Sequence, residues 1–466
     1  MKHFILLALA IFSTLKNLSA QAIGLDTLVL NGSADKYINI VFMGDGYTAS
    51  EQDKFITDAE KMTNYLFSQS PWSDYKNYFN VFAIKVVSNE SGTKHPNTAS
   101  DCSSSNVPVS DPDTYFSLTF DYNGIHRLVA PKNYPNVVKV LSENFPKYDQ
   151  AIIVANSPYY GGSGGDFATA TTHTSSSDVA AHEIGHSFAK LSDEYYAGDG
   201  YAYEKVNMTQ ETDPAKVKWK NWLGFNEIGI YQHCCGGNSA KWYKPSQKCK
   251  MQALGKEFCN VCREATIEKI HALVNPIVSY SPATSVISTE DSLITFHLDK
   301  LMKPLSNSLQ IDWTLDNQPF YTGTDSVQIN QSTLAAGKHT LVVTVVDTNL
   351  LQRINNHSSI HFSTVTWTID KKTTSTQVLS AANKISWSVT PNPATSFIRL
   401  ETESEDLVLL EVNISSLDGK LNKRILKQNI KGTFSDTFDV SSIQPGLYIL
   451  TFDMNGQKFT QKLVIQ

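Results

Sequence analysis

The sequence predicts an α/β (α+β) domain followed by two all-β sandwich domains. Before Pro276, continuous apolar runs typical of buried strands alternate with stretches of helical spacing. From Pro276 to about Asp370 the pattern changes to short stretches of alternating polarity with turn residues between them. A last β-rich unit ends at Gln466. The chain of 466 residues is also longer than one ordinary hydrophobic core, which favours several domains.

The α/β pattern begins with residues 37–43 (YINIVFM), an uninterrupted apolar run followed by glycines, as expected of a strand buried on both faces. A helix should come next, because Thr48 and Glu51 form a capping box and apolar side chains then recur at helical spacing. Two more strand-like runs, at 80–87 and 150–155, continue the alternation.

The β-rich part contains the alternating stretches LITFHL, LQIDWTL and HTLVVTVV, an architecture similar to immunoglobulin-like modules. Its likeness to those modules implies no function. The predicted organisation is a signal peptide over 1–22, the α/β domain over 23–276, an immunoglobulin-like β-sandwich over 277–370, a linker over 371–384 and a C-terminal β-rich domain over 385–466.

The first 22 residues have the pattern of a secretory signal. Lys2 precedes an apolar run from Phe4 to Phe12, and the small residues Ala20 and Ala22 lie where a signal peptidase would cut. That run is too short to span a bilayer, and no later segment approaches the roughly 20 apolar residues that a transmembrane helix needs. We therefore expect an exported, soluble chain with no transmembrane segment.

The charge balance excludes one class of partner. A formal net charge of -6 with 18% charged residues provides no basic surface that would hold nucleic acid or an anionic membrane. We expect no nucleic-acid partner.

The six cysteines are unevenly placed, with Cys102 alone and the other five between positions 234 and 262. In an exported chain we expect local disulfides. A structural zinc ion held by Cys249, Cys259 and Cys262 is the alternative, although their spacing lacks the paired CxxC motifs typical of such sites.

The stretch HEIGH predicts a metal site on a helix. His182 and His186 are four residues apart, so they project from one helical face and can hold a single ion. Glu183 stands about 60° from His186 and can reach a water molecule bound there. Ile184 and Phe188 point to the opposite side, as a helix packed on a core requires.

Two acids beyond this helix, Asp193 and Glu194, can supply the third ligand that a catalytic zinc site requires beside its open position. We favour Asp193 and keep Glu194 as the alternative. On an uninterrupted helix Asp193 would lie about 10 Å along the axis from His186, so the chain must turn before it. Tyr195 and Tyr196 are candidate donors to a developing oxyanion, and we expect at least one of them to serve packing instead.

Other features near the motif allow two interpretations each. Residues 166–173 (DFATATTH), after four glycines, form either an edge strand to which a peptide substrate adds or a flexible loop. Met251 lies either beneath the metal site or in the ordinary core. We assign no role to His173 or His233.

Four motifs together resemble the M64 metallopeptidases, often called IgA peptidases, over most of residues 25–272. They are MGDGYTASEQDKF, TYFSLTFDYNGIHRLV, HEIGHSFAKLSDEY and KCKM...FCNVCRE, in that order. The resemblance implies a metzincin-like zinc endopeptidase with His182 and His186 as ligands and Glu183 as base. The general metzincin pattern HExxHxxGxxH is broken, since Ala189 replaces the glycine and Ser192 the third histidine, although the following DEY fits the M64 pattern. Cleavage of immunoglobulin A does not follow from the family name.

The C-terminal unit resembles the sorting domains read by the type IX secretion system of Gram-negative bacteria. The motifs TPNPATSFIRLET, SSLDGK, DVSSIQPGLYIL and KLVIQ carry this resemblance. It implies export across the outer membrane to the cell surface or the medium, with the type IX machinery as a partner. A second small adhesive sandwich is the alternative.

The predicted function is a zinc-dependent endopeptidase that hydrolyses protein or peptide substrates. Zn²⁺ held by His182, His186 and Asp193 activates a water molecule, and Glu183, as general base, moves its proton to the departing amine. One alternative is a catalytically inactive surface adhesin on a peptidase-like scaffold. Another is a zinc hydrolase that acts on glycans or on amides other than peptides.

Overall fold

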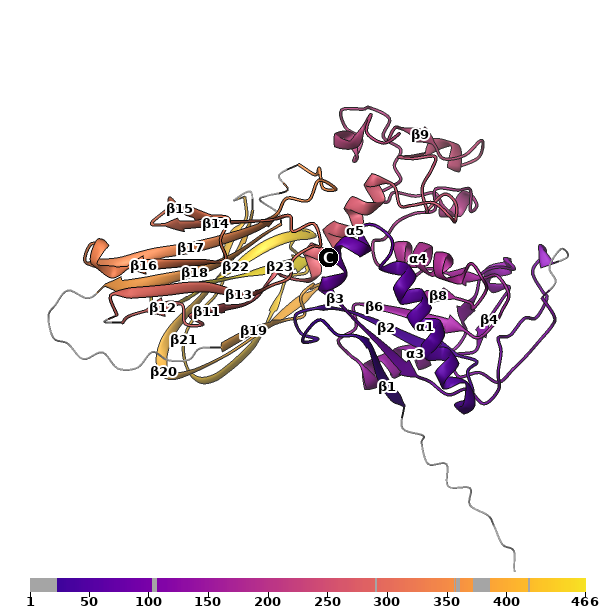
Figure 1. Cartoon of the computed structure of the whole chain (residues 1–466), viewed down its shortest axis with the longest axis horizontal. Coiled ribbons are helices and arrows are strands. Elements are labelled where there is room, and N and C mark those ends of the chain that lie inside the picture. The colour runs from indigo at the N-terminus through magenta and orange to yellow at the C-terminus, as the bar shows by residue number, and fades with distance from the viewer. Residues whose placement is uncertain are drawn as a thin grey trace, which may run out of the picture. The chain divides into compact units, whose positions relative to one another are not determined.

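The computed structural model describes residues 23–102, 107–289, 291–355, 357, 361–371, 386–417 and 420–466. The chain divides into two compact units, residues 1–372 and 373–466, which we describe separately (Figure 1). The predicted signal peptide, and all of the predicted linker except Lys371, lie outside the described residues. Among the described residues, no helix is both long and apolar enough to cross a bilayer.

A six-stranded sheet with the order β1-β3-β2-β6-β8-β7 forms the centre of the α/β part. Its strands are β1 (Gly24–Val29), β2 (Ile38–Asp45), β3 (Phe79–Lys85), β6 (Gln150–Ala155), β7 (Gly162–Ser163) and β8 (Ala168–Ala170). The four inner strands are parallel, and β1 and β7 pair antiparallel at the two ends. Every residue of β2 is buried, which explains its uninterrupted apolar sequence. The predicted strands at 37–43, 80–87 and 150–155 are confirmed.

Helices cover both faces of this sheet (Figure 1). Buried residues of α1 (Gln52–Leu66), α4 (Ser176–Ser187) and α5 (Asn260–Leu273) share one core with Ile40 of β2. Those of α3 (Tyr134–Asn144) share a second core with Val41 from the opposite face of the same strand. The predicted capping box is confirmed, because Thr48 N donates to Glu51 Oε2 at 2.9 Å where α1 begins.

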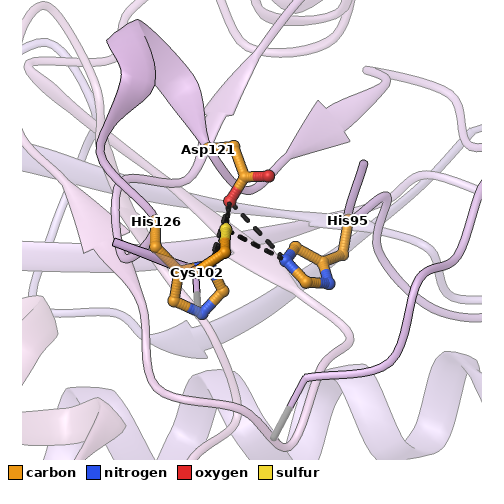
Figure 2. Close-up of side chains that lie close together, drawn as sticks. All are labelled: His95, Cys102, Asp121 and His126. Atoms are coloured by element: carbon orange, nitrogen blue, oxygen red, sulfur yellow. Dashed lines mark hydrogen bonds and ion pairs between the residues drawn. The ribbon is translucent and has the colours of Figure 1, made fainter. Parts of the chain in front are cut away.

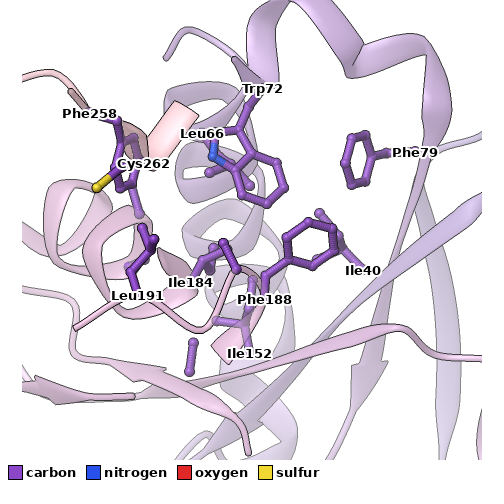
Figure 3. Packing of buried hydrophobic residues seen from close by; sticks show 14 of the residues in the cluster. Ile40, Leu66, Trp72, Phe79, Ile152, Ile184, Phe188, Leu191, Phe258 and Cys262 are labelled. Atoms are coloured by element: carbon purple, nitrogen blue, oxygen red, sulfur yellow. The ribbon is translucent and has the colours of Figure 1, made fainter. Parts of the chain in front are cut away.

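The first core holds the metal-motif helix in place. Figure 3 shows Ile184 and Phe188 of the α4 segment among Trp72, Phe79 and Ile152, with the Trp72 and Phe188 ring centroids 5.0 Å apart. The apolar side of α4 therefore faces the sheet, as its sequence predicts.

Short elements complete this part of the first unit. They are α2 (Trp72–Tyr75), η1 (Ala49–Glu51), η2 (Lys76–Tyr78), η4 (Tyr122–Gly124), η5 (Asp199–Tyr201), η6 (Lys220–Trp222), η7 (Ser239–Lys241), and the pairs β4 (Leu118–Thr119) with β5 (Ala130–Pro131) and β9 (Tyr231–Gln232) with β10 (Tyr243–Lys244).

The remainder of the first unit is two sheets around one core, as predicted for a β-sandwich. One sheet has the order β11 (Ile277–Ser281), β13 (Leu293–Leu301), β16 (Ser326–Asn330). The other has the order β12 (Val286–Ile287), β18 (Phe362–Lys371), β17 (Gly337–Asp347), β14 (Leu309–Leu315), β15 (Gln318–Thr322), and η8 (Gln331–Thr333) follows β16. Trp313 and Trp367 stack at 5.9 Å inside this core.

A buried polar contact joins the sandwich to the α/β part. The Asp347 side chain, 1% exposed, accepts hydrogen bonds from the Tyr75 hydroxyl and from His271 Nε2, the latter at 3.0 Å. Tyr78 donates its hydroxyl to the carbonyl of Met302 at 2.7 Å.

The second unit is one continuous five-stranded sheet, so the expected pair of sheets is not present there. Its strands are β19 (Ser386–Thr390), β20 (Phe397–Ser416), β21 (Asn422–Asp439), β22 (Gly446–Met454) and β23 (Gln457–Ile465). The long β20 pairs with β19, β21 and β22, and its register with β21 shifts between Ser404 and Val408. A bulge of this kind bends a strand, which lets a single sheet enclose its own core.

Candidate active site

Three atoms that can bind a metal converge beside α4. His182 Nε2 and His186 Nε2 are 3.2 Å apart, and Asp193 Oδ1 lies 3.1 Å from the first and 3.2 Å from the second. The structure thus brings together all three side chains that the sequence nominates as ligands.

The turn that delivers Asp193 follows the helix directly. Leu191 N donates to Gly185 O at 3.0 Å, and Lys190 has a φ of 55°, which together close the helix with a left-handed residue. Lys190 therefore makes the reversal, with Ala189 at the place where the metzincin pattern has glycine. Ser192 is held by Asn207, whose side chain accepts from Ser192 N at 2.8 Å and donates to Ser192 O at 2.9 Å.

Backbone carbonyls orient both imidazoles. His182 Nδ1 lies 3.0 Å from the carbonyl of Lys250, and His186 Nδ1 lies 2.8 Å from the carbonyl of Leu191. A carbonyl only accepts, so each Nδ1 carries the proton and each Nε2 directs its lone pair toward the space between the rings.

These donor atoms fit a zinc ion. Nitrogen and oxygen ligands of tetrahedral zinc lie about 3.3 Å from one another, close to the 3.1–3.2 Å found here. The site also favours positive charge: burial lowers the pKa of His186, but the Asp193 carboxylate outweighs that effect and raises it to about 9. Two imidazole lone pairs and a carboxylate in contact need a cation among them.

Glu183 lines a cavity of about 240 Å³ beside these atoms, together with His182, Arg127 and Tyr195. Burial raises the pKa of the Glu183 carboxyl above its usual range. The carboxylate is therefore positioned and tuned to exchange a proton inside the cavity.

Glycine allows the chain to pass close to this carboxylate. A Cβ on Gly164 would lie 2.6 Å from His186 Cβ and 3.0 Å from Glu183 Oε2. Gly162 N donates to Arg127 O at 3.1 Å, and Val129 N donates to Gly162 O at 3.3 Å. The sheet edge at Gly162 is thus already paired with residues 127–129.

The predicted substrate edge at 166–173 is wrong in position. Residues 168–170 do form a strand, β8, but it lies inside the sheet between β6 and β7. The edge strand β7 comes earlier in the chain, and the glycines that we took for a flexible approach to a strand themselves form it.

The two tyrosines after the acids have different surroundings. Tyr195 lines the cavity and accepts a hydrogen bond from Arg127 Nη2 at 3.4 Å, whereas Tyr196 is 54% exposed. Burial and the Asp193 charge raise the pKa of Tyr195 to about 12, so its hydroxyl stays protonated. His233 Nε2 donates to the Tyr195 carbonyl at 2.9 Å, which gives His233 a supporting position.

Arg127 belongs to the site but was not among the sequence-predicted residues. It lies 55 positions before the first histidine and in no metal or catalytic pattern. Only the pairing of residues 127–129 with β7 brings it to the cavity.

Glu194 points away from the histidines. It is fully buried, accepts from Asn207 Nδ2 at 3.0 Å and from Cys262 Sγ at 3.4 Å, and has Cys249 and Cys259 close by. All six cysteines lie in the described part of the chain and none is disulfide-bonded there, so the expected local disulfides are wrong for this structure.

Met251 lies directly beneath the helix that carries the histidines. It is fully buried, and its Sδ would be 2.9 Å from a Cβ on Gly185. Its carbonyl accepts from Glu194 N at 2.8 Å, which ties the methionine to the segment that carries Asp193.

Similarity to solved structures is weak. Dimeric latent PorU from Porphyromonas gingivalis is 14% identical, with 41% of this chain and 20% of that chain covered and a TM-score of 0.18. Fibronectin(III)-like modules of CbhA from Clostridium thermocellum are 11% identical, with 40% and 93% covered and a TM-score of 0.14. The match spans one fifth of the PorU chain, and TM-scores this low support no statement on fold or function. No curated protein matches the chain significantly.

Protein-family models match two segments of the chain. Residues 27–229 match the family described as IgA Peptidase M64, and residues 388–466 match the Secretion system C-terminal sorting domain. Both matches confirm the resemblances carried by the sequence motifs. Residues 27–229 are thus similar to the M64 peptidases, which indicates a peptidase, and residues 388–466 carry a type IX sorting domain, which indicates export to the cell surface or the medium.

Proposed function

We propose that this protein is an exported zinc-dependent endopeptidase with His182, His186 and Asp193 as metal ligands and Glu183 as general base. The observation that carries the proposal is the convergence of three donor atoms at 3.1–3.2 Å beside a buried carboxylate in a cavity. Bound zinc supplies Lewis acidity, which polarises a peptide carbonyl and acidifies a water molecule.

Glu183 carries the proton in this mechanism. Its carboxylate accepts a proton from the attacking water and later delivers it to the amine nitrogen that leaves when the peptide bond breaks. Burial supports both steps, because a pKa above the usual range brings the carboxyl closer to the pH at which it works.

Tyr195 and Arg127 supply positive polarity on the cavity wall. The Tyr195 hydroxyl accepts from Arg127, so its own proton remains available to the oxygen of the carbonyl under attack. Neither residue needs to change its charge during the reaction.

A metzincin-like fold is the architecture that we propose for this domain. The support is a metal-motif helix on a mostly parallel sheet, a turn after that helix that returns the third ligand, and a buried methionine beneath both histidines.

The test compares the full chain with its Glu183→Gln variant on a diverse peptide library, with and without a chelator. We expect chelator-sensitive cleavage in the wild type, and at least a 10²-fold lower rate in Glu183→Gln with zinc content unchanged, because only the general base is removed. Glu143→Gln, which changes an exposed carboxylate on α3, is the matched control.

Two results would contradict the assignment. Cleavage at the wild-type rate by Glu183→Gln would remove Glu183 as the base. Bound zinc without peptide cleavage would move the proposal to a hydrolase for glycans or other amides, and neither zinc nor cleavage would leave a binding protein.

A further inference from the structure

A second group of metal-binding side chains lies in the irregular segment between β3 and α3. Figure 2 shows His95, Cys102, Asp121 and His126 pointing toward one another. One donor atom from each lies within 4.8 Å of the other three. His95 is fully buried, and Cys102 and Asp121 are 6% and 8% exposed.

The distances within this group match tetrahedral coordination. Cys102 Sγ lies 3.1 Å from Asp121 Oδ1, 3.3 Å from His126 Nδ1 and 3.8 Å from His95 Nε2. Asp121 Oδ1 lies 2.9 Å from His126 Nδ1 and 3.6 Å from His95 Nε2. Ligands of tetrahedral zinc lie about 3.3 to 3.6 Å from one another when one of them is sulfur.

Outer hydrogen bonds orient the donor atoms inward. His95 Nδ1 lies 3.0 Å from the carbonyl of Pro108, so Nδ1 carries the proton and Nε2 faces the group with its lone pair. Asp121 Oδ2 accepts from Thr98 N at 2.7 Å, which leaves Oδ1 for the group. Such outer contacts are what fix the ligands of a metal site.

A network of hydrogen bonds alone does not account for the group. The Cys102 thiol has one proton, yet Asp121 Oδ1 and two imidazole nitrogens surround its sulfur. With its Nδ1 proton given to Pro108, His95 has only that same thiol proton to accept from within the group.

A nucleophilic cysteine also fits poorly. In such sites a carboxylate orients the histidine through the nitrogen remote from the nucleophile. Here Asp121 Oδ1 contacts the same His126 nitrogen as the sulfur and contacts the sulfur itself. Desolvation and the Asp121 carboxylate raise the pKa of the Cys102 thiol, which opposes a free thiolate.

We propose that His95, Cys102, Asp121 and His126 bind a structural zinc ion, separate from the site at His182 and His186. Two imidazoles, a thiolate and a carboxylate are all zinc ligands, and four protein ligands leave no open position for substrate. The role is therefore structural. The sequence did not reveal it, because the ligands are spaced 7, 19 and 5 residues apart in no recognised pattern.

The ion would fix one wall of the active-site cavity. His126 precedes Arg127, which contacts Tyr195 and whose carbonyl accepts from Gly162 N at 3.1 Å. Residues 86–129 contain only short regular elements, so a metal cross-link would replace the core that this segment lacks. This coupling to catalysis rests on the proposed function, whereas the metal site does not.

The test is metal content of the zinc-loaded full chain, measured per folded molecule. Cys102→Ala should bind one zinc fewer than the wild type, and the exposed control Cys235→Ala should bind the wild-type number. A folded Cys102→Ala chain with wild-type zinc content would overturn the proposal. If Cys102→Ala does not fold, Cys102→Ser, which keeps the side-chain volume, repeats the measurement.

Alkylation of Cys102 in the wild type decides the matter if neither variant folds. We expect iodoacetamide to modify Cys102 at least tenfold faster after chelation, because bound zinc would mask the sulfur. An unchanged rate would then overturn the proposal. Neither readout uses peptide cleavage, so failure of the proposed peptidase and failure of this site are distinguishable.

A different observation supports a second structural site. Glu194 Oε2 is buried and has no hydrogen-bond partner among the described residues, although Glu194 Oε1 has two. Cys249, Cys259 and Cys262 offer sulfur atoms within 4.8 Å of that carboxylate and of one another. A buried carboxylate with an unsatisfied oxygen is costly unless a cation is near.

We infer that Glu194, Cys249, Cys259 and Cys262 also bind a structural zinc ion. It would anchor the segment whose Lys250 carbonyl orients His182. Cys262→Ser should lower zinc content by one per chain, with Cys235→Ser as control. Unchanged content in folded Cys262→Ser, or a disulfide between Cys249 and Cys262 in the intact mass of the zinc-loaded chain, would overturn this inference.

Discussion

Asp193 and Glu194 show how neighbouring acids of similar chemistry come to face different sites. Asp193 contacts both imidazoles of the histidine pair, while Glu194 faces three cysteine sulfurs. The sequence places both acids correctly after the helix but cannot rank them by spacing alone. The choice depends on the turn at Lys190, a residue type that seldom adopts a positive φ, so the position of the turn was not readable.

Substitution of Asp193 should weaken the metal site directly. Asp193→Asn removes the charge that holds His182 and His186, and we expect at least tenfold weaker zinc binding at this site. Competition with a chromophoric chelator measures it. Asp213→Asn, on a partly exposed ion pair, is the matched control, and equal affinity in Asp193→Asn would exclude Asp193 as a ligand.

At the scale of elements, α4, its following turn and the β7 strand together build the site. The sheet and α4 were predictable, because long apolar runs and a helical face are local signals. The β7 strand was not, because Gly162–Ser163 carries no pattern, and its pairing with residues 127–129 depends on a segment far away in sequence.

The close approach of β7 to α4 can be tested by adding one methyl group. Gly164→Ala places a Cβ 2.6 Å from His186 Cβ and should lower kcat/KM at least tenfold by displacing the ligand and Glu183. Gly165→Ala is the control, since nothing lies within 4 Å of its Cβ. Equal losses in the two variants would show that the approach of β7 does not matter.

The junction between α5 and β17 should give acid-dependent stability. Burial raises the pKa of Asp347, but His271 and other donors outweigh it and lower the pKa to about 2, below the unfolded value of about 3.9. A depressed pKa stabilises the fold above about pH 4 and loses that contribution as pH falls toward 2, an effect on the order of 2 kcal/mol.

Asp347→Asn should therefore lower the unfolding temperature at pH 6 and differ little from the wild type near pH 2. Thermal unfolding followed by circular dichroism checks both points. Asp312→Asn, on the partly exposed part of β14, is the control. A wild-type difference that stays constant from pH 6 to pH 2 would contradict the assigned charge.

For the whole molecule, the division into two compact units separates chemistry from export. The candidate active site lies in residues 1–372, and the sorting-domain match lies in residues 388–466 of the other unit. This division was readable from composition, because a polar segment separates the two patterns. The grouping of His95, Cys102, Asp121 and His126 was not readable, because a long irregular segment brings them together.

Removal of the second unit should leave the first one intact. We expect a chain ending at Lys371 to keep the thermal unfolding transition and the peptide cleavage of the first unit but to lose export from its native host. Unfolding curves and culture-medium fractions measure these. Loss of cleavage on truncation, with the fold retained, would show that the second unit contributes to the activity.

The central claim is a zinc ion among His182, His186 and Asp193. The most direct measurement is anomalous diffraction at the zinc absorption edge from crystals of the zinc-loaded full chain. The proposal predicts an anomalous peak between the two Nε2 atoms and Asp193 Oδ1. Electron density for these three side chains with no anomalous peak among them would contradict it.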